Sequence, residues 1–324
     1  WTALALKSRF CLFEGTFRKY HGIDLPENDW KYYLDLSAKA SEEFITNSGY
    51  GLYTSGGTQT AYRDLFVSED AQQIEVVLAR DYNKGLSVFH NSTFYSLNTS
   101  YGRPGLTRKI VASYLMADGT RFTDKAGWET MEFRDECQNR DPRLAQSIRT
   151  PGYTRINSTK VEVPSLSTCM TGYQPIKWVI DDTSMDSNTA PCATCIPILR
   201  YAEVLLNYAE AKAELGEFSE TVWNATIKLL RERAGVDGAM PSAYDPYMAE
   251  YFLNTTTDMA ILEIRRERGI ELLLENCRWD DDMRWGMGRL LERPWYGVYV
   301  GELGKVYDLS LIHISEPTRP EPIS

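Results

Sequence analysis

The sequence predicts a mostly α-helical fold, in which helical hairpins pack against a loop-rich part of the chain. Apolar residues recur at three- and four-residue steps, the spacing of a helix, near both ends of the chain. Residues 197–216 are apolar or small around most of the helical circumference, so other elements must cover this helix on several sides. In contrast, residues 50–196 are rich in Gly, Pro, Asn, Ser and Thr, a composition typical of loops.

Residues 1–49 are expected to form a helical hairpin. The first helix covers residues 2–20 and should end near Gly22, because glycine readily adopts the left-handed conformation that closes a helix. Asn28 or Asp29 can then cap the second helix with a side-chain oxygen that accepts from the first free N–H groups. Two helices joined by so short a connector pack as an antiparallel hairpin.

The helix that we expect to be central covers residues 197–216. Pro197 suits the first turn of a helix, and Gly216 suits the position just past its end. Together with a helix at residues 219–234 it repeats the hairpin arrangement, which suggests units like tetratricopeptide repeats, although their signature residues are not met in order. One narrow polar stripe runs along this helix and consists of Glu203, Asn207, Glu210 and Glu214.

Residues 258–285 return to a helical pattern that carries many charges. The four consecutive charges from Arg265 to Arg268 sweep roughly 300° at about 100° per residue, so at least one must face packed protein. A buried charge must be paired, so we expect this segment to meet the central helix in one interior through an ion network that fixes helix register. A catalytic carboxylate pair is the alternative. The candidate members of the structural ion network are Glu203, Glu210, Arg265, Arg268, Glu271, Glu275, Arg278 and Asp281.

Composition and motifs argue against several classes of partner and cofactor. The net charge of −10 argues against nucleic-acid binding, which needs a basic surface. No apolar run is long enough to cross a bilayer. The three histidines are isolated and no phosphate-binding glycine loop occurs, so neither a metal site nor a cofactor is expected. Cys192 and Cys195 indicate a chance C-x-x-C or a local disulfide rather than half of a zinc site.

Several segments, in order along the chain, resemble motifs of the SusD/RagB family. Two C-terminal ones are R-Y-A-E-V-L-L-N-Y-A-E-A (200–211) and I-R-R-E-R-G-I-E-L…R-W-D-D-D-M-R-W (264–285). The others are L-K-S-R-F-C-L-F-E-G-T-F-R-K-Y-H (6–21), Y-R-D-L-F (62–66), R-D-P-R-L (140–144) and T-G-Y-Q-P-I-K-W (171–178). Gly269, Asn276 and Asp282 depart from the residues usual in the family, which weakens the ion network locally without affecting the fold.

The resemblance implies a SusD-like fold, with tetratricopeptide-like helical hairpins packed against a loop-rich ligand-binding region. It implies a surface-exposed lipoprotein of the outer membrane of Bacteroidota that captures oligosaccharides or polysaccharides for a SusC-like TonB-dependent transporter. Such a protein binds its ligand without chemistry. Because Trp1 already stands in a helical pattern, we expect the true N-terminus, which would carry the lipid anchor, to be missing.

On this basis the chain divides into four parts. Residues 1–49 form a hairpin of the repeat scaffold, residues 50–196 the loop-rich ligand-binding region, and residues 197–309 the C-terminal helical region. Within the second part, alternating apolar residues predict a short strand at Ile74, Val76 and Leu78. Residues 310–324 resemble a translated sequencing adapter, so we expect a non-native and disordered tail.

Sugars bind to proteins by stacking on aromatic rings, while amides, carboxylates and guanidinium groups bond their hydroxyls. Aromatic residues held outward in loops, with polar neighbours, are therefore the candidates. The candidate ligand-binding residues are Tyr82, Asn83, Phe94, Tyr95, Asn98, Tyr101, Arg103 and Trp128. For each ring the alternative role is to anchor its loop to the scaffold, and no catalytic residue is assigned.

Two other classes of function stay open at the level of sequence. Glycoside hydrolysis needs two carboxylates at a defined separation, and among 45 acidic residues the sequence offers no way to choose a pair. A pure protein-binding scaffold is the other class, because helical repeats often present extended binding surfaces. The sequence names neither the glycan nor any metal that would assist its binding.

Overall fold

The computed structural model describes residues 1–156, 158–301, 306–307 and 314–315, and most of its regular elements are helices. The α-helices are α1 (Thr2–His21), α2 (Trp30–Asn47), α3 (Gly57–Val67), α4 (Ser92–Leu97), α5 (Arg108–Ser113), α6 (Phe133–Glu136), α7 (Pro142–Ser147), α8 (Tyr201–Glu214), α9 (Glu220–Ala225), α10 (Ile227–Ala234), α11 (Pro246–Tyr251), α12 (Met259–Glu271) and α13 (Arg278–Arg284). The strands are β1 (Val76–Arg80), β2 (Ile196–Arg200), β3 (Val306–Tyr307) and β4 (Ile314–Ser315). Short 3₁₀ helices are η1 (Lys84–Leu86), η2 (Phe122–Asp124), η3 (Trp128–Thr130), η4 (Thr183–Met185) and η5 (Gly288–Glu292).

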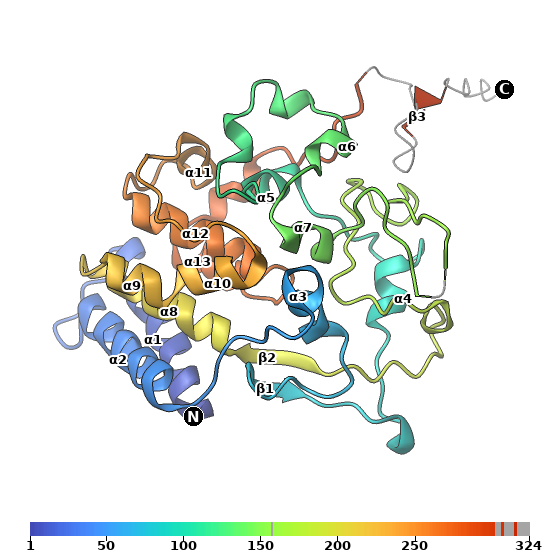
Figure 1. Ribbon diagram of the computed structural model, residues 1–324. Coiled ribbons are helices and arrows are strands. Elements are labelled where there is room, and N and C mark those ends of the chain that lie inside the picture. The colour runs from blue at the N-terminus through green and yellow to red at the C-terminus, as the bar shows by residue number, and fades with distance from the viewer. Residues whose placement is uncertain (157, 302–305, 308–313, 316–324) are drawn as a thin grey trace.

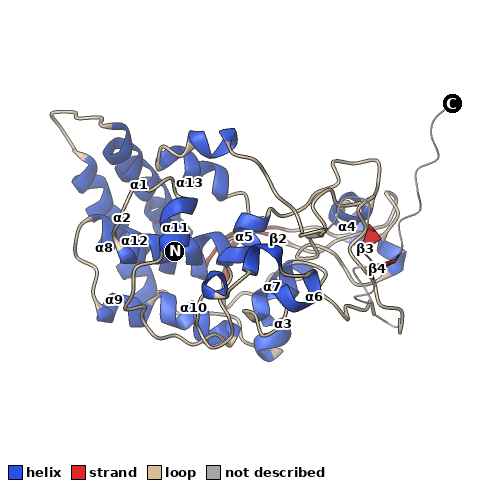
Figure 2. Ribbon diagram, turned by 90° about the horizontal axis from the view of Figure 1, so that it is seen from above, coloured by secondary structure: helices blue, strands red, loops and turns tan. Residues whose placement is uncertain are grey.

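The long helices and the long loops occupy opposite ends of the molecule. Helices α1, α2, α8 and α9 lie together at one end, and α4 with the loops around it lies at the other (Figures 1 and 2). Between α3 and β2, each α-helix of the described residues has six residues or fewer, and the one strand there is β1. Within the described part of the chain, the helices are too short or too polar to cross a bilayer. The predicted tail at 310–324 lies outside the described residues, except for β4, which pairs with β3.

Helices α1 and α2 form the hairpin that the sequence predicts. Gly22, with a φ of 63°, follows the last residue of α1, and Asp29 caps α2 by accepting a 2.9 Å hydrogen bond from its first turn. The two helices approach closely at Gly15, where a Cβ atom would lie 2.8 Å from Cγ of Leu34. The buried residues of α1 are mostly small, namely Ala5, Ser8, Gly15 and Thr16 together with Leu12, whereas Phe10 is 65% exposed.

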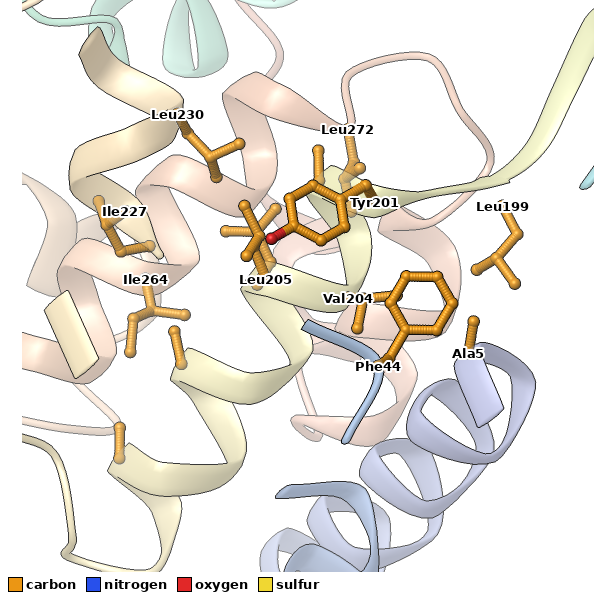
Figure 3. Close-up of a cluster of buried hydrophobic side chains, with 14 of the residues drawn as sticks. Ala5, Phe44, Leu199, Tyr201, Val204, Leu205, Ile227, Leu230, Ile264 and Leu272 are labelled. Carbon is orange, nitrogen blue, oxygen red and sulfur yellow. The ribbon is translucent and has the colours of Figure 1, made fainter. Parts of the chain in front are cut away.

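Helix α8 lies in the centre of the main core, as the sequence predicts. Its Leu205 packs in one cluster with Phe44 of α2, Leu230 of α10 and Ile264 of α12 (Figure 3). The central helix and the charged C-terminal segment therefore share one interior. The four residues of the polar stripe are buried as well, because they face other helices rather than solvent. For example, the amide of Asn207 bonds a serine of α1 and an arginine of α12.

The start of the central helix differs from the prediction. Pro197 does not open the helix but belongs to β2, which pairs antiparallel with β1, and α8 begins only after this strand. Proline lacks the N–H that a strand donates, and it is tolerated here because the sheet has two strands and both are edges. Strand β1 contains Val76 and Leu78, as expected, whereas Ile74 precedes it and is half exposed.

Two predicted helices are each divided into a pair. Residues 219–234 form α9 and α10, and residues 258–285 form α12 and α13. Between α12 and α13, Leu274 and Asn276 have φ angles of 60° and 63°, which cannot continue a right-handed helix. The resulting turn lets α13 pack against α1.

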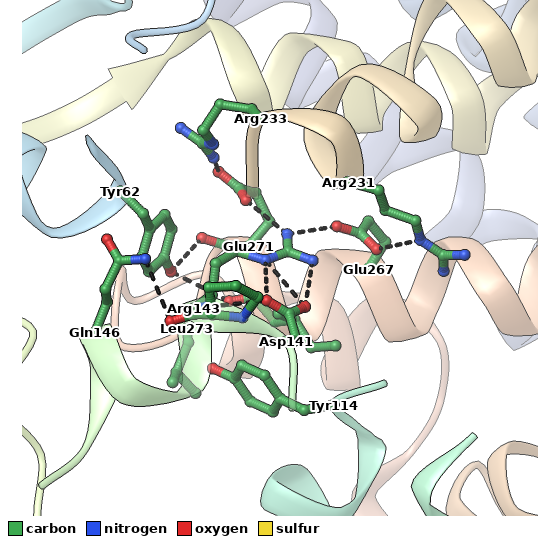
Figure 4. A network of polar contacts seen from close by, with 12 residues as sticks. Tyr62, Tyr114, Asp141, Arg143, Gln146, Arg231, Arg233, Glu267, Glu271 and Leu273 are labelled. Carbon is green, nitrogen blue, oxygen red and sulfur yellow. Dashed lines mark hydrogen bonds and ion pairs between the residues drawn. The ribbon is translucent and has the colours of Figure 1, made fainter. Parts of the chain in front are cut away.

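A network of buried arginines and carboxylates joins α12 to the rest of the core (Figure 4). Glu271 accepts hydrogen bonds from Arg143 of α7 at 2.9 Å and from Arg200 of β2 at 2.6 Å, and it pairs with Arg233 of α10. Glu267, one turn earlier, also binds Arg143, at 2.5 Å. Burial would raise the pKa of Glu271, but the three arginines outweigh it and hold the pKa well below its usual range. The sequence analysis included Glu271 but none of these arginines.

A second group of pairs joins α12 and α13 to α8. Nε of Arg268 lies 2.7 Å from Oδ2 of Asp281, and its Nη1 donates to the side-chain oxygen of Asn207 at 2.8 Å. Arg284, which the sequence analysis did not include, donates to Glu210 at 2.7 Å and to Asp281 at 2.8 Å. The structure thus brings Arg268, Asp281 and Glu210 together around one further arginine.

Glu203 and Glu275 bind partners that the sequence did not suggest. Glu203 on α8 accepts from Nε of Arg9 of α1 at 2.6 Å. Glu275, in the turn after α12, accepts from Arg200 and from Lys177, each at 2.7 Å. Both carboxylates therefore tie the C-terminal half of the chain to earlier segments.

Arg265 and Arg278 lie outside this network, in contrast to the prediction. Arg265 is fully buried, yet no described residue accepts a hydrogen bond from its guanidinium. That group instead lies against aromatic rings, 5.3 Å from the centroid of Phe252 and 4.5 Å from that of Trp285. Cation–π attraction in a water-excluded site takes the place of an ionic partner. Arg278 donates to the hydroxyl of Tyr251 at 2.9 Å.

Replacing Arg268 tests whether the network is structural. Arg268→Met should lower the free energy of unfolding by about 3–5 kcal/mol, because buried carboxylates lose a cation. Urea unfolding followed by tryptophan fluorescence measures this change. As a control, Lys39→Met removes the exposed pair between Lys39 and Asp35 and should change the free energy by less than about 1 kcal/mol. A variant at Arg268 that keeps its stability and loses ligand binding would show a functional network instead.

The network also predicts how stability depends on pH. Burial would raise the pKa values of Glu210, Glu267, Glu271 and Asp281, but neighbouring arginines outweigh it and lower all four. A carboxyl group whose pKa is lower in the folded state than in the unfolded state stabilises the fold at every pH above its unfolded-state pKa. This stabilisation is lost as the pH falls through the folded-state pKa. The urea midpoint should therefore hold from neutral pH to about 5 and drop steeply below that. A midpoint that rises on further acidification would contradict this reasoning.

Candidate functional site

Three of the candidate rings lie together on an exposed surface. Phe94 and Tyr95 stand on α4, and Tyr101 follows in the next loop. The ring centroids of Tyr95 and Tyr101 are 5.0 Å apart, and that of Phe94 lies 5.3 Å from that of Tyr101. Tyr95 is 50% exposed and Tyr101 44% exposed, so both offer ring surface to a ligand. We call these three residues the tyrosine cluster.

Two of the polar candidates, Asn98 and Asn83, are bonded within their own loops. The side-chain oxygen of Asn98 accepts from the N–H of Ser100 at 2.7 Å, and that of Asn83 accepts from the N–H of Leu86 at 3.1 Å. Arg103 is exposed, with a φ of 43°, and its guanidinium bonds no residue that the structure describes. Arg103 is therefore the polar candidate best placed to bind a ligand here.

Tyr82 forms a packed contact within its loop. Its ring centroid lies 4.5 Å from that of His90, and the guanidinium of Arg80 lies 5.2 Å from the tyrosine ring centroid. The contact with His90 holds the loop that follows β1 against the residues before α4, and the contact with Arg80 holds the ring against the end of β1. The alternative role of a ring that anchors its loop suits Tyr82 better than ligand stacking.

The cysteines of the C-x-x-C motif are free thiols, so of the two interpretations left open by the sequence the structure agrees with a chance C-x-x-C rather than a local disulfide. The two residues make separate contacts: Sγ of Cys192 lies 3.8 Å from Nε2 of His90, and the N–H of Cys195 donates to the carbonyl of Ser68 at 2.9 Å. Burial would raise the pKa of Cys192, but the contact with His90 outweighs it and lowers the pKa. Among the described residues, no group of three His, Cys, Asp or Glu side chains could hold a metal ion.

Trp128 lies elsewhere, on η3, and lines a cavity of about 450 Å³. Its ring packs edge to face against Tyr247 of α11, with centroids 5.4 Å apart, and against Phe122 at 6.1 Å. We call this space the tryptophan cavity. Its other lining residues are Arg108, Lys109, Glu129, Thr130, Tyr247, Glu250, Tyr296 and Tyr299. It therefore combines aromatic rings with charged and hydroxyl groups that can bond sugar hydroxyls.

The structure does not bring Trp128 and the tyrosine cluster together. Helix α11, against which Trp128 packs, lies well apart from helix α4 in both views (Figures 1 and 2). The sequence analysis grouped rings that are close along the chain and missed those that come from beyond residue 240. The run P-W-Y-G-V-Y at 294–299 is the signal that could have indicated them, because it places exposed rings in a loop.

A smaller cavity of about 210 Å³ adjoins the tryptophan cavity, since Lys109 and Tyr296 line both. It lies between α5, α11, α13 and residues 290–296, and we call it the lysine cavity. Its other lining residues are Thr107, Tyr251, Arg278, Asp282, Leu290, Leu291, Arg293, Pro294 and Trp295.

A third cavity, of about 520 Å³, lies between α1, β2 and the turn after α12. Most of its charged lining residues are already paired, as Arg9 is with Glu203 and Arg268 with Asp281. A sugar bound here would compete with these buried pairs, so this cavity is a poorer candidate than the tryptophan cavity.

Residues 74–310 match the SusD family, which is well over half of the chain. The chain belongs to the SusD family. The matched stretch of this SusD family member contains the tyrosine cluster and the residues that line the tryptophan and lysine cavities. A search of curated proteins gave no match.

Solved SusD-like structures share the fold. A SusD-like protein from Bacteroides fragilis is 23% identical, with a TM-score of 0.66, and the match covers 93% of this chain and 57% of that one. A SusD-like carbohydrate-binding protein from the same species is 22% identical with a TM-score of 0.66, covering 93% and 55%. A third structure, determined with a xylogluco-oligosaccharide, is 18% identical with a TM-score of 0.58, covering 89% and 51%. This chain thus spans little more than half the length of these relatives, and the mostly helical, SusD-like fold is confirmed.

Proposed function

We propose that this SusD family member binds oligosaccharides or polysaccharides and carries out no chemistry on them. The observation that carries the proposal is the tryptophan cavity, where rings and hydrogen-bonding groups line one space of about 450 Å³. Trp128 is held edge to face by Tyr247 and Phe122, so its ring is already ordered before a ligand arrives. Preorganised rings lose little conformational entropy when a sugar stacks on them.

The polar wall of the tryptophan cavity is also ordered in advance. Nε of Arg108 donates to the carbonyl of Gly297 at 2.9 Å, and its Nη1 donates to the carbonyl of Glu129 at 2.8 Å. These bonds tie α5 to η3 and to the loop that carries Tyr296. The carboxylate of Glu129 is exposed and can accept from sugar hydroxyls, whereas that of Glu250 is exposed but pairs with Arg293.

The tyrosine cluster is the second surface that we propose for a glycan. Its exposed rings offer stacking surface, and Arg103, an exposed residue two positions after Tyr101, offers a guanidinium for sugar hydroxyls, at a place apart from the tryptophan cavity. A polysaccharide that contacts both surfaces would gain affinity from both, because the second contact becomes intramolecular.

The relatives support a glycan as the class of ligand. One is described as carbohydrate-binding and another was determined with a xylogluco-oligosaccharide. We further propose the cellular role that the family resemblance implies. In that role the full-length protein is anchored by lipid at the outer membrane, faces the cell surface, and passes glycans to a SusC-like TonB-dependent transporter.

Alanine substitutions test the placement of the glycan. Trp128→Ala and Tyr95→Ala should each weaken retention in affinity gels that contain the bound polysaccharide, by roughly tenfold, since loss of a buried aromatic contact costs about 1.5 kcal/mol. The matched control is Tyr32→Ala on α2, because Tyr32 is also an exposed ring and lies on the scaffold. Unchanged mobility of both variants across a panel of polysaccharides would reject this placement.

The same purified protein separates the proposal from the two other classes of function. Release of reducing sugar from a bound polysaccharide would indicate glycoside hydrolysis. Binding to the transporter together with no retention by any polysaccharide would indicate a protein-binding scaffold. We expect retention without release.

A further inference from the structure

The lysine cavity differs in charge from the rest of the protein. The chain has a net charge of −10, yet three cations, Lys109, Arg278 and Arg293, line this cavity with a single carboxylate, that of Asp282. The cations come from α5, α13 and the loop after η5, so they converge from three separate segments. A positively charged cavity in an acidic protein favours an anionic ligand.

Lys109 is the cation without a partner. Its ammonium makes no ion pair or hydrogen bond with any residue in the described part of the chain, and it lies 5.9 Å from the ring centroid of Tyr251. Burial lowers the pKa of Lys109, since a partly desolvated ammonium is less stable than a solvated one, and attraction to Glu250 offsets only part of this effect. Its backbone is fixed, because the hydroxyl of Tyr247 donates to the Lys109 carbonyl at 2.7 Å.

The two arginines are only partly satisfied. Arg278 donates one N–H group to the hydroxyl of Tyr251, and its Nε lies 3.8 Å from Oδ1 of Asp282. Its Nη1 is buried and bonds none of the residues that the structure describes. Arg293 pairs with Glu250, whose carboxylate lines the neighbouring tryptophan cavity rather than the lysine cavity. An anion between Lys109 and Arg278 would satisfy donors that the protein leaves unbonded.

Aromatic rings stand beside these cations. Trp295 is 68% exposed and Tyr296 is 60% exposed, and both line the lysine cavity. Tyr296 also lines the tryptophan cavity, so a chain of sugars could run from one space into the other. Free phosphate or a simple anion would leave these rings unused, whereas a sugar that carries an acidic group would use both features.

We propose that the lysine cavity binds the acidic group of an anionic glycan, a carboxylate or a sulfate ester, with Lys109 and Arg278 as its donors and Trp295 and Tyr296 as stacking surfaces. This proposal rests on the proposed function and narrows its ligand to acidic glycans.

An array of uronate-containing, sulfated and neutral glycans tests the proposal on the whole chain. The wild-type protein should bind uronate-containing or sulfated glycans most strongly, and this binding should weaken as sodium chloride is raised. Binding of the uronate-containing glycans would identify the acidic group as a carboxylate, and binding of the sulfated glycans would identify it as a sulfate ester. Retention of neutral glycans alone would overturn the proposal and leave glycan binding intact, whereas no binding to any glycan would overturn the proposed function itself.

Three variants test whether the binding of acidic glycans takes place in the lysine cavity. Lys109→Gln should weaken binding to the acidic glycan by about tenfold and remove much of its salt dependence. Lys39→Gln makes the same charge change on exposed α2 and should alter neither. Asp282→Asn removes the carboxylate of the cavity and should strengthen binding severalfold, because Oδ1 of Asp282 has no hydrogen-bond partner among the described residues to lose. Equal binding by wild type and Lys109→Gln, at matched unfolding midpoints, would overturn the proposal.

Discussion

The need to compensate each buried charge, by an opposite charge or by aromatic rings, constrains the whole C-terminal half of this protein. Helix α12 carries charged side chains around its circumference and lies in the interior, so solvent cannot satisfy them. Glu271, for example, binds three arginines, one each from α7, β2 and α10. An uncompensated buried charge costs several kcal/mol, so α12 is satisfied only when all of these segments are in place. We regard register specification, rather than net stabilisation, as the role of these pairs.

The same assembly positions the cavities. Pairs between Arg268, Asp281 and Arg284 hold α13 beside α12, and α13 supplies one wall of the lysine cavity. The hydroxyl of Tyr247 on α11 donates a hydrogen bond to the carbonyl of Lys109 on α5. Lys109 lines both the lysine cavity and the tryptophan cavity. The rings that we propose to contact a ligand thus stand in segments fixed by a rigid helical scaffold, a common arrangement for binding sites.

Local sequence patterns predicted individual helices and strands better than they predicted which elements and side chains contact one another. The hairpin of α1 and α2, the cap at Asp29 and the burial of α8 follow from periodicity and capping, which depend on neighbours within a few residues. Pro197 was misplaced because a proline suits both a first helical turn and an edge strand, and only the pairing with β1 distinguishes them. Arg265 was misassigned because an arginine among aromatic residues can satisfy itself by cation–π contact, which charge counting does not include.

By itself the sequence determined the helical class, the family motifs and the existence of a buried ion network, because each is encoded by residue types at short, regular spacing. Only the tertiary structure decided which arginine meets which carboxylate and which rings share a cavity. Arg143 and Glu271 are separated by 128 positions, and Trp128 meets Tyr247 from another distant segment. Periodicity describes the faces of one element at a time, whereas these contacts depend on how several elements pack, and that packing is set by the burial of all faces together.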